Sequence, residues 1–327
     1  MRRSLLIPGV AIAGALGGTA VAVRRTLNQW AQNPDPLHGQ PPRFPPGQSR
    51  TVQTDDGAEI YTRRSGAGPT IVLVHGLTSN HDDWGPVAER LVAAGFEVVA
   101  VDQRGHGGST VGRDGFGVER QAADLAQVLV ALDVRDALLA GHSMGGMAAM
   151  GVAVHDPEVL GDRVAGLGLV ATSATMQQRH NQVQFRIGAT PPARRLGRHP
   201  EWFTIATGKT VLGARPSLGL VRASLASYHR CPEATRIGAA QGLLDFDILE
   251  RLPGIDCPTL VVCGDHDRLT PHARSEEIAD GIPNARLVTL ADAGHMVIWE
   301  EIDQLADLLA GFARDVQAGT RTTTGSG

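Results

Sequence analysis

Gly141-His142-Ser143-Met144-Gly145 is the most informative sequence in this chain. It fits the pattern G-x-S-x-G and lies between an apolar run, residues 137–140, and residues 146–150, which read as the start of a helix. A strand, a sharp turn and a helix in that order present the serine hydroxyl at the edge of a sheet. We interpret the two outer glycines as a requirement of the crowded turn, because a Cβ atom there would meet neighbouring backbone. The sequence therefore predicts a reactive serine at position 143.

A serine hydroxyl is a weak nucleophile at neutral pH, so it needs a base, usually a histidine that a carboxylate orients. The chain offers both after Ser143. Asp265 and Asp267 follow an apolar run that ends in Gly264, and His295 follows a second such run. Catalytic groups collect past the carboxyl ends of strands in open α/β sheets. We therefore expect His295 and one of the two aspartates to meet Ser143, although Asp265 could instead cap the helix that follows.

Apolar runs and helical patterns alternate along the chain, which predicts a mostly parallel sheet with flanking helices. A starting hairpin is expected at residues 51–62, with Asp56-Gly57 at its turn. Further strands are expected at 70–74, 97–101, 137–140, 164–170, 259–263 and 286–290, and helices at 87–94 and 119–132, among others. Residues 172–254 show no strand pattern and read as several short helices.

Five motifs in the same order resemble the α/β-hydrolase superfamily, and the resemblance covers residues 50–316. They are His75-Gly76-Leu77, Asp102-Gln103-Arg104-Gly105-His106-Gly107-Gly108-Ser109, Gly141 to Gly146, Gly264-Asp265-His266-Asp267 with Pro271, and Gly294-His295 with Glu300 beyond it. The resemblance implies the α/β-hydrolase fold and makes residues 172–254 a helical cap insertion over the active site. It also places the catalytic acid at Asp267 rather than at Asp265.

The branch that the motifs resemble contains esterases, lipases and cofactor-free haloperoxidases. It implies hydrolysis of small-molecule or lipid carboxylic esters through an acyl-enzyme, with no cofactor and no metal. Ser143 would attack, His295 would act as the base, Asp267 would orient His295, and the backbone N–H groups of Leu77 and Met144 would hold the oxyanion. Two alternatives stay open. One is a perhydrolase or cofactor-free haloperoxidase activity, and the other is a non-catalytic receptor or scaffold on the same fold.

The N-terminal residues 1–30 differ in kind from the rest. Leu5 to Val23 is an uncharged run of 19 residues, which as a helix just spans a hydrocarbon core of roughly 30 Å. We expect a single span in the cell membrane, with the catalytic domain outside the cytoplasm. A cleaved signal peptide is the alternative, because Ala20-Val21-Ala22 resembles a cleavage site, but Arg24 and Arg25 directly after it suit a retained anchor better.

The two segments that flank the predicted domain are low in apolar residues. Residues 31–49 hold six of the chain's 19 prolines and are expected to form a semi-rigid linker between anchor and enzyme. Residues 317–327 are rich in Thr, Gly and Ser and are expected to be a disordered tail. The net charge of −4 and the absence of a basic–aromatic pattern argue against nucleic acid as a partner.

Overall fold

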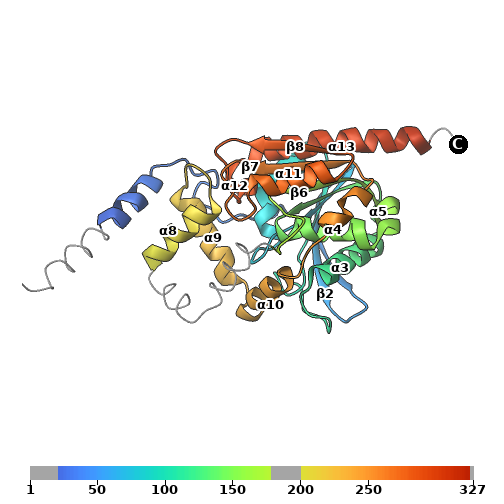
Figure 1. The fold of residues 1–327 in the computed structure, drawn as a ribbon, viewed down its shortest axis with the longest axis horizontal. Helices are drawn as coiled ribbons and strands as arrows, with labels where there is room; N and C mark the ends of the chain where they lie inside the picture. Colours follow the sequence, from blue (N-terminus) through green and yellow to red (C-terminus); the bar gives the residue numbers. More distant parts are fainter. Residues whose placement is uncertain (1–20, 178–199, 325–327) are drawn as a thin grey trace, which may run out of the picture.

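The computed structural model describes residues 21–177 and 200–324, which form one eight-stranded sheet with helices on both faces (Figure 1). The strand order is β1-β2-β4-β3-β5-β6-β7-β8. β1 (Gln48–Gln53) and β2 (Glu59–Gly66) form the expected hairpin, and β2 is also antiparallel to β4 (Glu97–Val101). The other neighbouring pairs are parallel, so the predicted mostly parallel sheet is confirmed.

The strands lie where the apolar runs predict them. β3 (Thr70–Val74), β4 and β6 (Val164–Val170) have the expected bounds. β5 (Ala137–His142), β7 (Thr259–Gly264) and β8 (Ala285–Leu290) differ from the expected bounds by one or two residues. The central strands carry apolar residues on both faces, as expected for a sheet covered on both sides.

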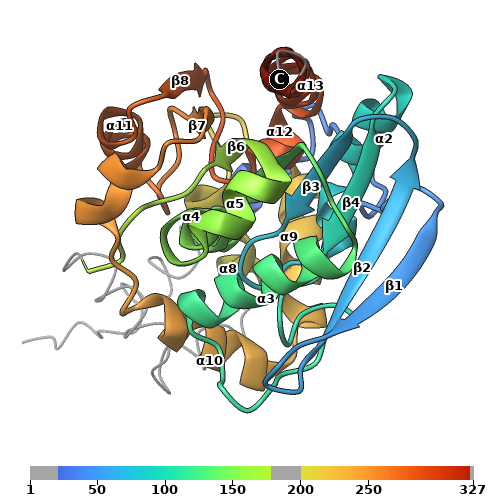
Figure 2. The same cartoon turned by 90° about the vertical axis from the view of Figure 1, so that its right-hand side faces the viewer.

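Alternate residues of each strand face two separate helical layers. On one face, Val72 and Val74 pack in a core with helices α3 (Val118–Ala131), α4 (Met144–His155) and α11 (His272–Gly281). On the other, Ile71 and Leu73 pack with α2 (Gly85–Ala93), α12 (Val297–Glu300) and α13 (Ile302–Thr324). Figure 2 shows these layers, with the β1–β2 hairpin at one edge of the sheet and β8 at the other. The short helix α5 (Pro157–Arg163) contacts α3 and α4.

The described part of the predicted cap is helical. It contains α8 (Pro200–Val211), α9 (Leu218–Arg230), α10 (Glu233–Leu243) and the 3₁₀ helix η2 (Leu249–Gly254), and it lies between β6 and β7. An isolated bridge between Thr175 and Asp247 joins its two ends. Figure 1 shows α8 and α9 side by side, next to the helical residues 21–30.

Residues 31–47, for which the sequence predicts a semi-rigid linker, are packed on the domain in the structure. Trp30, Leu37 and Phe44 are buried in the same core as α2 and α13. The Phe44 N–H donates to Asp82 Oδ1 at 2.9 Å, and Asn33 Nδ2 donates to the Pro216 carbonyl of the cap at 2.8 Å. The three buried apolar side chains outweigh the extended preference of the prolines around them.

The expected disordered tail is wrong for residues 317–324. Helix α13 continues to Thr324, because the apolar face that includes Leu305, Leu309 and Phe312 packs on the sheet. Gln317 Nε2 extends this docking by donating to the carbonyl oxygens of Thr70 and Asp136.

Among the helices of residues 21–177 and 200–324, none is both long enough and apolar enough to cross a bilayer. The predicted span, Leu5 to Val23, lies outside the described residues except for its last three positions.

Candidate active site

Ser143 occupies the strained turn between β5 and α4 that its motif predicts. Its φ is 53° and its ψ is −119°, a conformation that a non-glycine residue rarely adopts. A Cβ atom at Gly141 would come within 2.3 Å of the Gly145 backbone, and one at Gly145 within 2.3 Å of the Val74 carbonyl oxygen. The turn is held by the Thr172 hydroxyl, which donates to the Ser143 carbonyl at 2.7 Å. Packing and hydrogen bonds thus offset the strain and keep the serine at the sheet edge.

His295 and Asp267 form a buried pair. His295 Nδ1 donates to Asp267 Oδ2 at 2.8 Å. The other carboxylate oxygen accepts from the N–H groups of Leu269 and Thr270 at 2.8 and 2.9 Å, and the Thr270 hydroxyl donates to Oδ2. Burial alone would raise the pKa of Asp267, but the His295 charge and these hydrogen bonds outweigh it and lower the pKa below its usual range. The carboxylate is therefore ionised at neutral pH and fixes which ring nitrogen of His295 carries the proton.

The two aspartates of this loop differ sharply in environment. The side chain of Asp267 is fully buried against His295, whereas that of Asp265 is 42% exposed, with the equally exposed His266 beside it. The structure thus brings Asp267, and not Asp265, to the histidine. Pro271 rather than Asp265 precedes the first residue of α11.

Ser143 and His295 line one cavity of about 440 Å³ between the sheet edge and the cap. Leu77 and Thr270 line it as well. Most of its wall is apolar, and much of that wall comes from the cap helices α8 and α9; the apolar lining includes Met147, Met176, Phe203, Val211, Leu225 and Leu243. A cap over such a cavity excludes water and shapes the space beside the serine.

The loop after β3 lies against Ser143, as the oxyanion prediction requires. A Cβ atom at Gly76 would come within 3.1 Å of the Ser143 Cβ atom. Histidines brace this loop. His106 Nε2 accepts from the Thr78 N–H at 3.2 Å, and His75 Nδ1 donates to the Gly76 carbonyl at 2.7 Å. Leu77 therefore lies at the cavity, and Met144 starts α4 directly after Ser143, where the helix dipole favours negative charge.

The comparisons with known proteins agree with this geometry. The family described as alpha/beta hydrolase fold matches residues 69–302. The chain belongs to the α/β-hydrolase family.

Several relatives of this α/β-hydrolase have named activities. A non-heme haloperoxidase from Rhodococcus erythropolis is 31% identical over 274 residues, which cover 79% of this chain and 97% of that protein. A thermophilic esterase from Thermogutta terrifontis is similar in structure, with a TM-score of 0.70, 27% identity, and 83% of this chain and 99% of that one covered. A membrane phospholipase A has a TM-score of 0.67 and 25% identity, and the match covers 94% of this chain and 97% of that one.

Two further side chains of the α/β-hydrolase brace the His295 loop. His142 Nε2 donates to the His295 carbonyl at 2.8 Å, and burial lowers the pKa of His142 to about 3, so the ring stays neutral. Glu300 accepts from the Gly294 N–H at 3.0 Å and from the Gly213 N–H of the cap at 2.6 Å. Glu300 thus ties the histidine loop to the turn between α8 and α9. Burial raises the pKa of Glu300 to about 7, although the two N–H groups oppose that shift.

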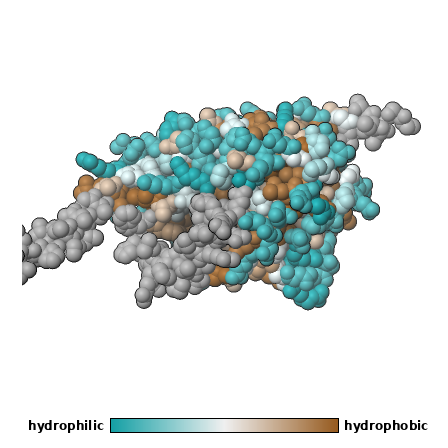
Figure 3. All heavy atoms as spheres, in the orientation of Figure 1, coloured by the Kyte–Doolittle hydropathy of each residue, from teal (hydrophilic) through white to brown (hydrophobic). Residues whose placement is uncertain are grey.

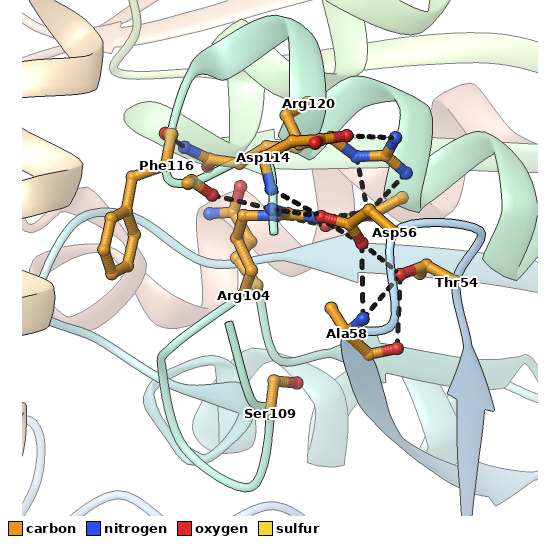
Figure 4. A network of polar contacts seen from close by, with 12 residues as sticks. Thr54, Asp56, Ala58, Arg104, Ser109, Asp114, Phe116 and Arg120 are labelled. Carbon is orange, nitrogen blue, oxygen red and sulfur yellow. Dashed lines mark hydrogen bonds and ion pairs between the residues drawn. The ribbon is translucent and has the colours of Figure 1, made fainter. Parts of the chain in front are cut away.

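The loop after β4, with its D-x-R-G-x-G-x-S motif, stabilises the fold and does not line the cavity. The Arg104 guanidinium is fully buried between two carboxylates, Asp124 at 2.6 Å and Asp56 at 3.1 Å (Figure 4). Asp102 accepts from the backbone N–H groups of His81 and Gly108.

Sequence reasoning missed Thr270 and Asp83. Thr270 had a weak signal, since it lies three positions after Asp267 in the same loop. Asp83 had none, because its partners Ser227 and Arg230 lie 144 and 147 positions away in the sequence. It is buried at the cavity wall, where burial raises its pKa to about 6 against the opposing effect of its hydrogen bonds with Ser79 and Ser227.

Proposed function

We propose that this protein hydrolyses carboxylic esters through Ser143, His295 and Asp267. The observation that carries the proposal is the convergence of these residues. A serine on a strained turn and a histidine paired at 2.8 Å with a buried carboxylate line one largely apolar cavity.

The chemistry follows from these positions. The Ser143 hydroxyl attacks the ester carbonyl carbon while His295 accepts its proton through Nε2. Asp267 stabilises the resulting imidazolium. The oxyanion is held by the N–H groups of Leu77 and Met144, and each such donor contributes about 10²–10³ in turnover. His295 then protonates the departing alcohol, and water, deprotonated by the same histidine, releases the acid from the acyl-enzyme.

A panel of p-nitrophenyl esters with acyl chains of increasing length tests this proposal, with Ser143→Ala as the matched control. We expect turnover of short and medium acyl chains that fit the cavity, and a loss of more than about 10³ in kcat for Ser143→Ala. Wild-type activity in Ser143→Ala, or turnover of no ester by the wild-type protein, would overturn the proposal.

Perhydrolysis is a second candidate, favoured by the similarity to the haloperoxidase from Rhodococcus erythropolis. In that reaction hydrogen peroxide takes the place of water at the acyl-enzyme and yields a peracid. The test measures peracid with acetate and peroxide supplied together and singly. Peracid formation that requires Ser143 and both reagents supports this activity. If no peracid forms, hydrolysis remains as the single proposed activity.

We also infer that the apolar run Leu5 to Val23 holds the enzyme at a membrane. The support is the length of the run and its lack of charge. Residues 21–30, the first described part of the chain, lie beside the cap helices, and Figure 3 shows apolar side chains gathered at that end of the molecule. Full-length protein should sediment with membranes and resist extraction by high salt, whereas protein released by salt would contradict a spanning anchor. A mature protein that begins near Val23 would indicate a cleaved signal instead.

A further inference from the structure

A second polar cluster lines the catalytic cavity, apart from the triad. Its centre is Asp83 of the 3₁₀ helix η1 (His81–Trp84), whose side chain is only 1% exposed. The hydroxyl of Ser79, from the core, donates to Asp83 at 2.6 Å, and that of Ser227, from cap helix α9, donates at 2.8 Å. Arg230 adds a contact at 3.2 Å. We call Ser79, Asp83 and Ser227 the acceptor cluster.

The hydrogen atoms of this cluster are already committed. A serine hydroxyl has one hydrogen to donate and two lone pairs to accept with. Both serine hydrogens point to the Asp83 carboxylate, so each oxygen is left with lone pairs alone. Ser227 accepts one further bond, from Arg230 at 2.8 Å. All three residues of the cluster line the cavity, so what they offer a bound molecule is acceptor capacity without a donor hydrogen.

Because the surrounding cavity wall is apolar, the acceptor character of the cluster decides which groups bind there. Near the cluster the cavity is walled by apolar and aromatic groups, among them Leu225, Tyr228 and Trp299. In such a setting a donor that reaches the cluster gains a hydrogen bond with a charge-assisted partner, whereas an alkyl group gains none and displaces any water there.

We propose that the acceptor cluster is a substrate subsite that selects esters carrying a hydrogen-bond donor, a hydroxyl or an N–H group, away from the scissile carbonyl. The proposal rests on the ester hydrolysis proposed above and adds the substrate class. The cluster also joins core to cap through Ser227 and Arg230, but a purely structural joint would not favour one ester over another.

Matched ester pairs test the subsite on both sides of the scissile bond. On the acyl side, p-nitrophenyl 3-hydroxybutanoate and 6-hydroxyhexanoate are each compared with the parent ester and with the methoxy analogue, which keeps the oxygen but lacks the donor hydrogen. On the alcohol side, 2-hydroxyethyl butanoate is compared with propyl butanoate. We expect kcat/KM for at least one hydroxy ester to exceed that of each analogue it is compared with by about tenfold, the usual size of one hydrogen bond to a charged group.

Three variants assign that preference to the cluster. Ser79→Ala and Ser227→Ala should each reduce the ratio of hydroxy ester to parent toward one. Ser224→Ala is the matched control, because Ser224 lines the same cavity but its hydroxyl donates to the neutral Leu220 carbonyl at 2.9 Å and not to the Asp83 carboxylate. The ratio should survive in that variant. A wild-type enzyme that hydrolyses the esters without a hydroxyl preference, or a preference that survives both cluster variants, would overturn the subsite.

Binding separates failure of the subsite from failure of the proposed reaction. Ser143→Ala protein retains the cluster, so calorimetry should show tighter binding of the preferred hydroxy ester than of its parent. That binding preference, found together with no turnover by the wild-type protein, would reject ester hydrolysis and keep the subsite. Equal binding of the two esters would reject the subsite.

Discussion

At the scale of single residues, the two neighbouring aspartates of the acid loop provide a matched pair. Asp267 is buried on His295 Nδ1, and Asp265 is half-exposed. We predict that Asp267→Asn lowers kcat by about 10³–10⁴, because an amide no longer fixes the proton on the correct ring nitrogen. Asp265→Asn should stay within about twofold of wild type. Ester kinetics on both variants, with melting curves to exclude unfolding, check the prediction, and the reverse order of effects would contradict it.

Glu300 should make stability depend on pH. Its pKa is raised from 4.5 to about 7 in the folded protein, so between those values the folded state holds a proton that the unfolded chain has lost. Unfolding then releases a proton, and the free energy of unfolding falls as pH rises from 4.5 to 7, by up to about 1.4 kcal/mol per pH unit.

Urea unfolding at pH 6 and pH 7.5 measures this dependence. The range begins at the raised pKa of Asp83, about 6, so Asp83 contributes with the same sign in both proteins and cancels in their comparison. Wild type should lose more stability across the range than Glu300→Gln, which cannot titrate. Equal losses in the two proteins would show that Glu300 does not titrate there.

At the scale of elements, Arg104 joins parts of the fold that the sheet alone does not fix. Its guanidinium binds Asp56 in the β1–β2 turn and Asp124 on α3 (Figure 4). We predict that Arg104→Leu destabilises the protein by about 3–5 kcal/mol, because it leaves the buried Asp56 carboxylate without a counter-charge and Asp124 with Arg120 alone. Arg104→Lys should recover only part of the loss, since an ammonium cannot make the forked contacts.

The control for this prediction is an exposed arginine that also bridges two aspartates. Arg135 contacts Asp133 and Asp162 and is 51% exposed, so Arg135→Ala should cost less than about 1 kcal/mol. Denaturant unfolding of the three variants gives the change in the free energy of unfolding for each. A similar loss for Arg104→Leu and Arg135→Ala would contradict the role of burial.

At the scale of the whole molecule, residues 21–47 hold cap and core together. Trp30 lies so close to Gly208 of α8 that a Cβ atom there would come within 2.5 Å of its ring, while Phe44 is buried in the core beside α2. We predict that Trp30→Ala lowers the melting temperature by roughly 5–15 °C and raises KM, because the cap helices that line the cavity lose their support.

Val130→Ala serves as the control, since Val130 is 47% exposed on α3. It should change neither the melting temperature nor KM.

A shortened protein tests the same support. Because residues 21–47 hold the cap and the core together, a protein that begins at Gln48 should be less stable than one that begins at Val21. An unchanged melting temperature in Trp30→Ala would show that residues 21–47 do not support the cap.

Much of the fold could be predicted because its signals are local. The strands are continuous apolar runs, and the turn at Ser143 is encoded by the two glycines beside it, so both can be identified within a few residues. The order of serine, acid and histidine also placed His295 and one of two aspartates at one sheet edge, and the family resemblance singled out Asp267, which the structure pairs with His295 at 2.8 Å.

The remaining features depend on contacts between distant parts of the chain. Prolines and a Thr/Gly/Ser-rich end favoured an extended linker and a loose tail, but burial of Trp30, Phe44 and the apolar face of α13 outweighed those local preferences. The acceptor cluster joins Asp83 to Ser227, which lie 144 positions apart. The sequence alone determined the strands, the strained turn and the order of the triad, because each is encoded in neighbouring residues. Only the tertiary structure decided the support of the cap and the polarity of the cavity, because these arise where the folded chain brings distant side chains together.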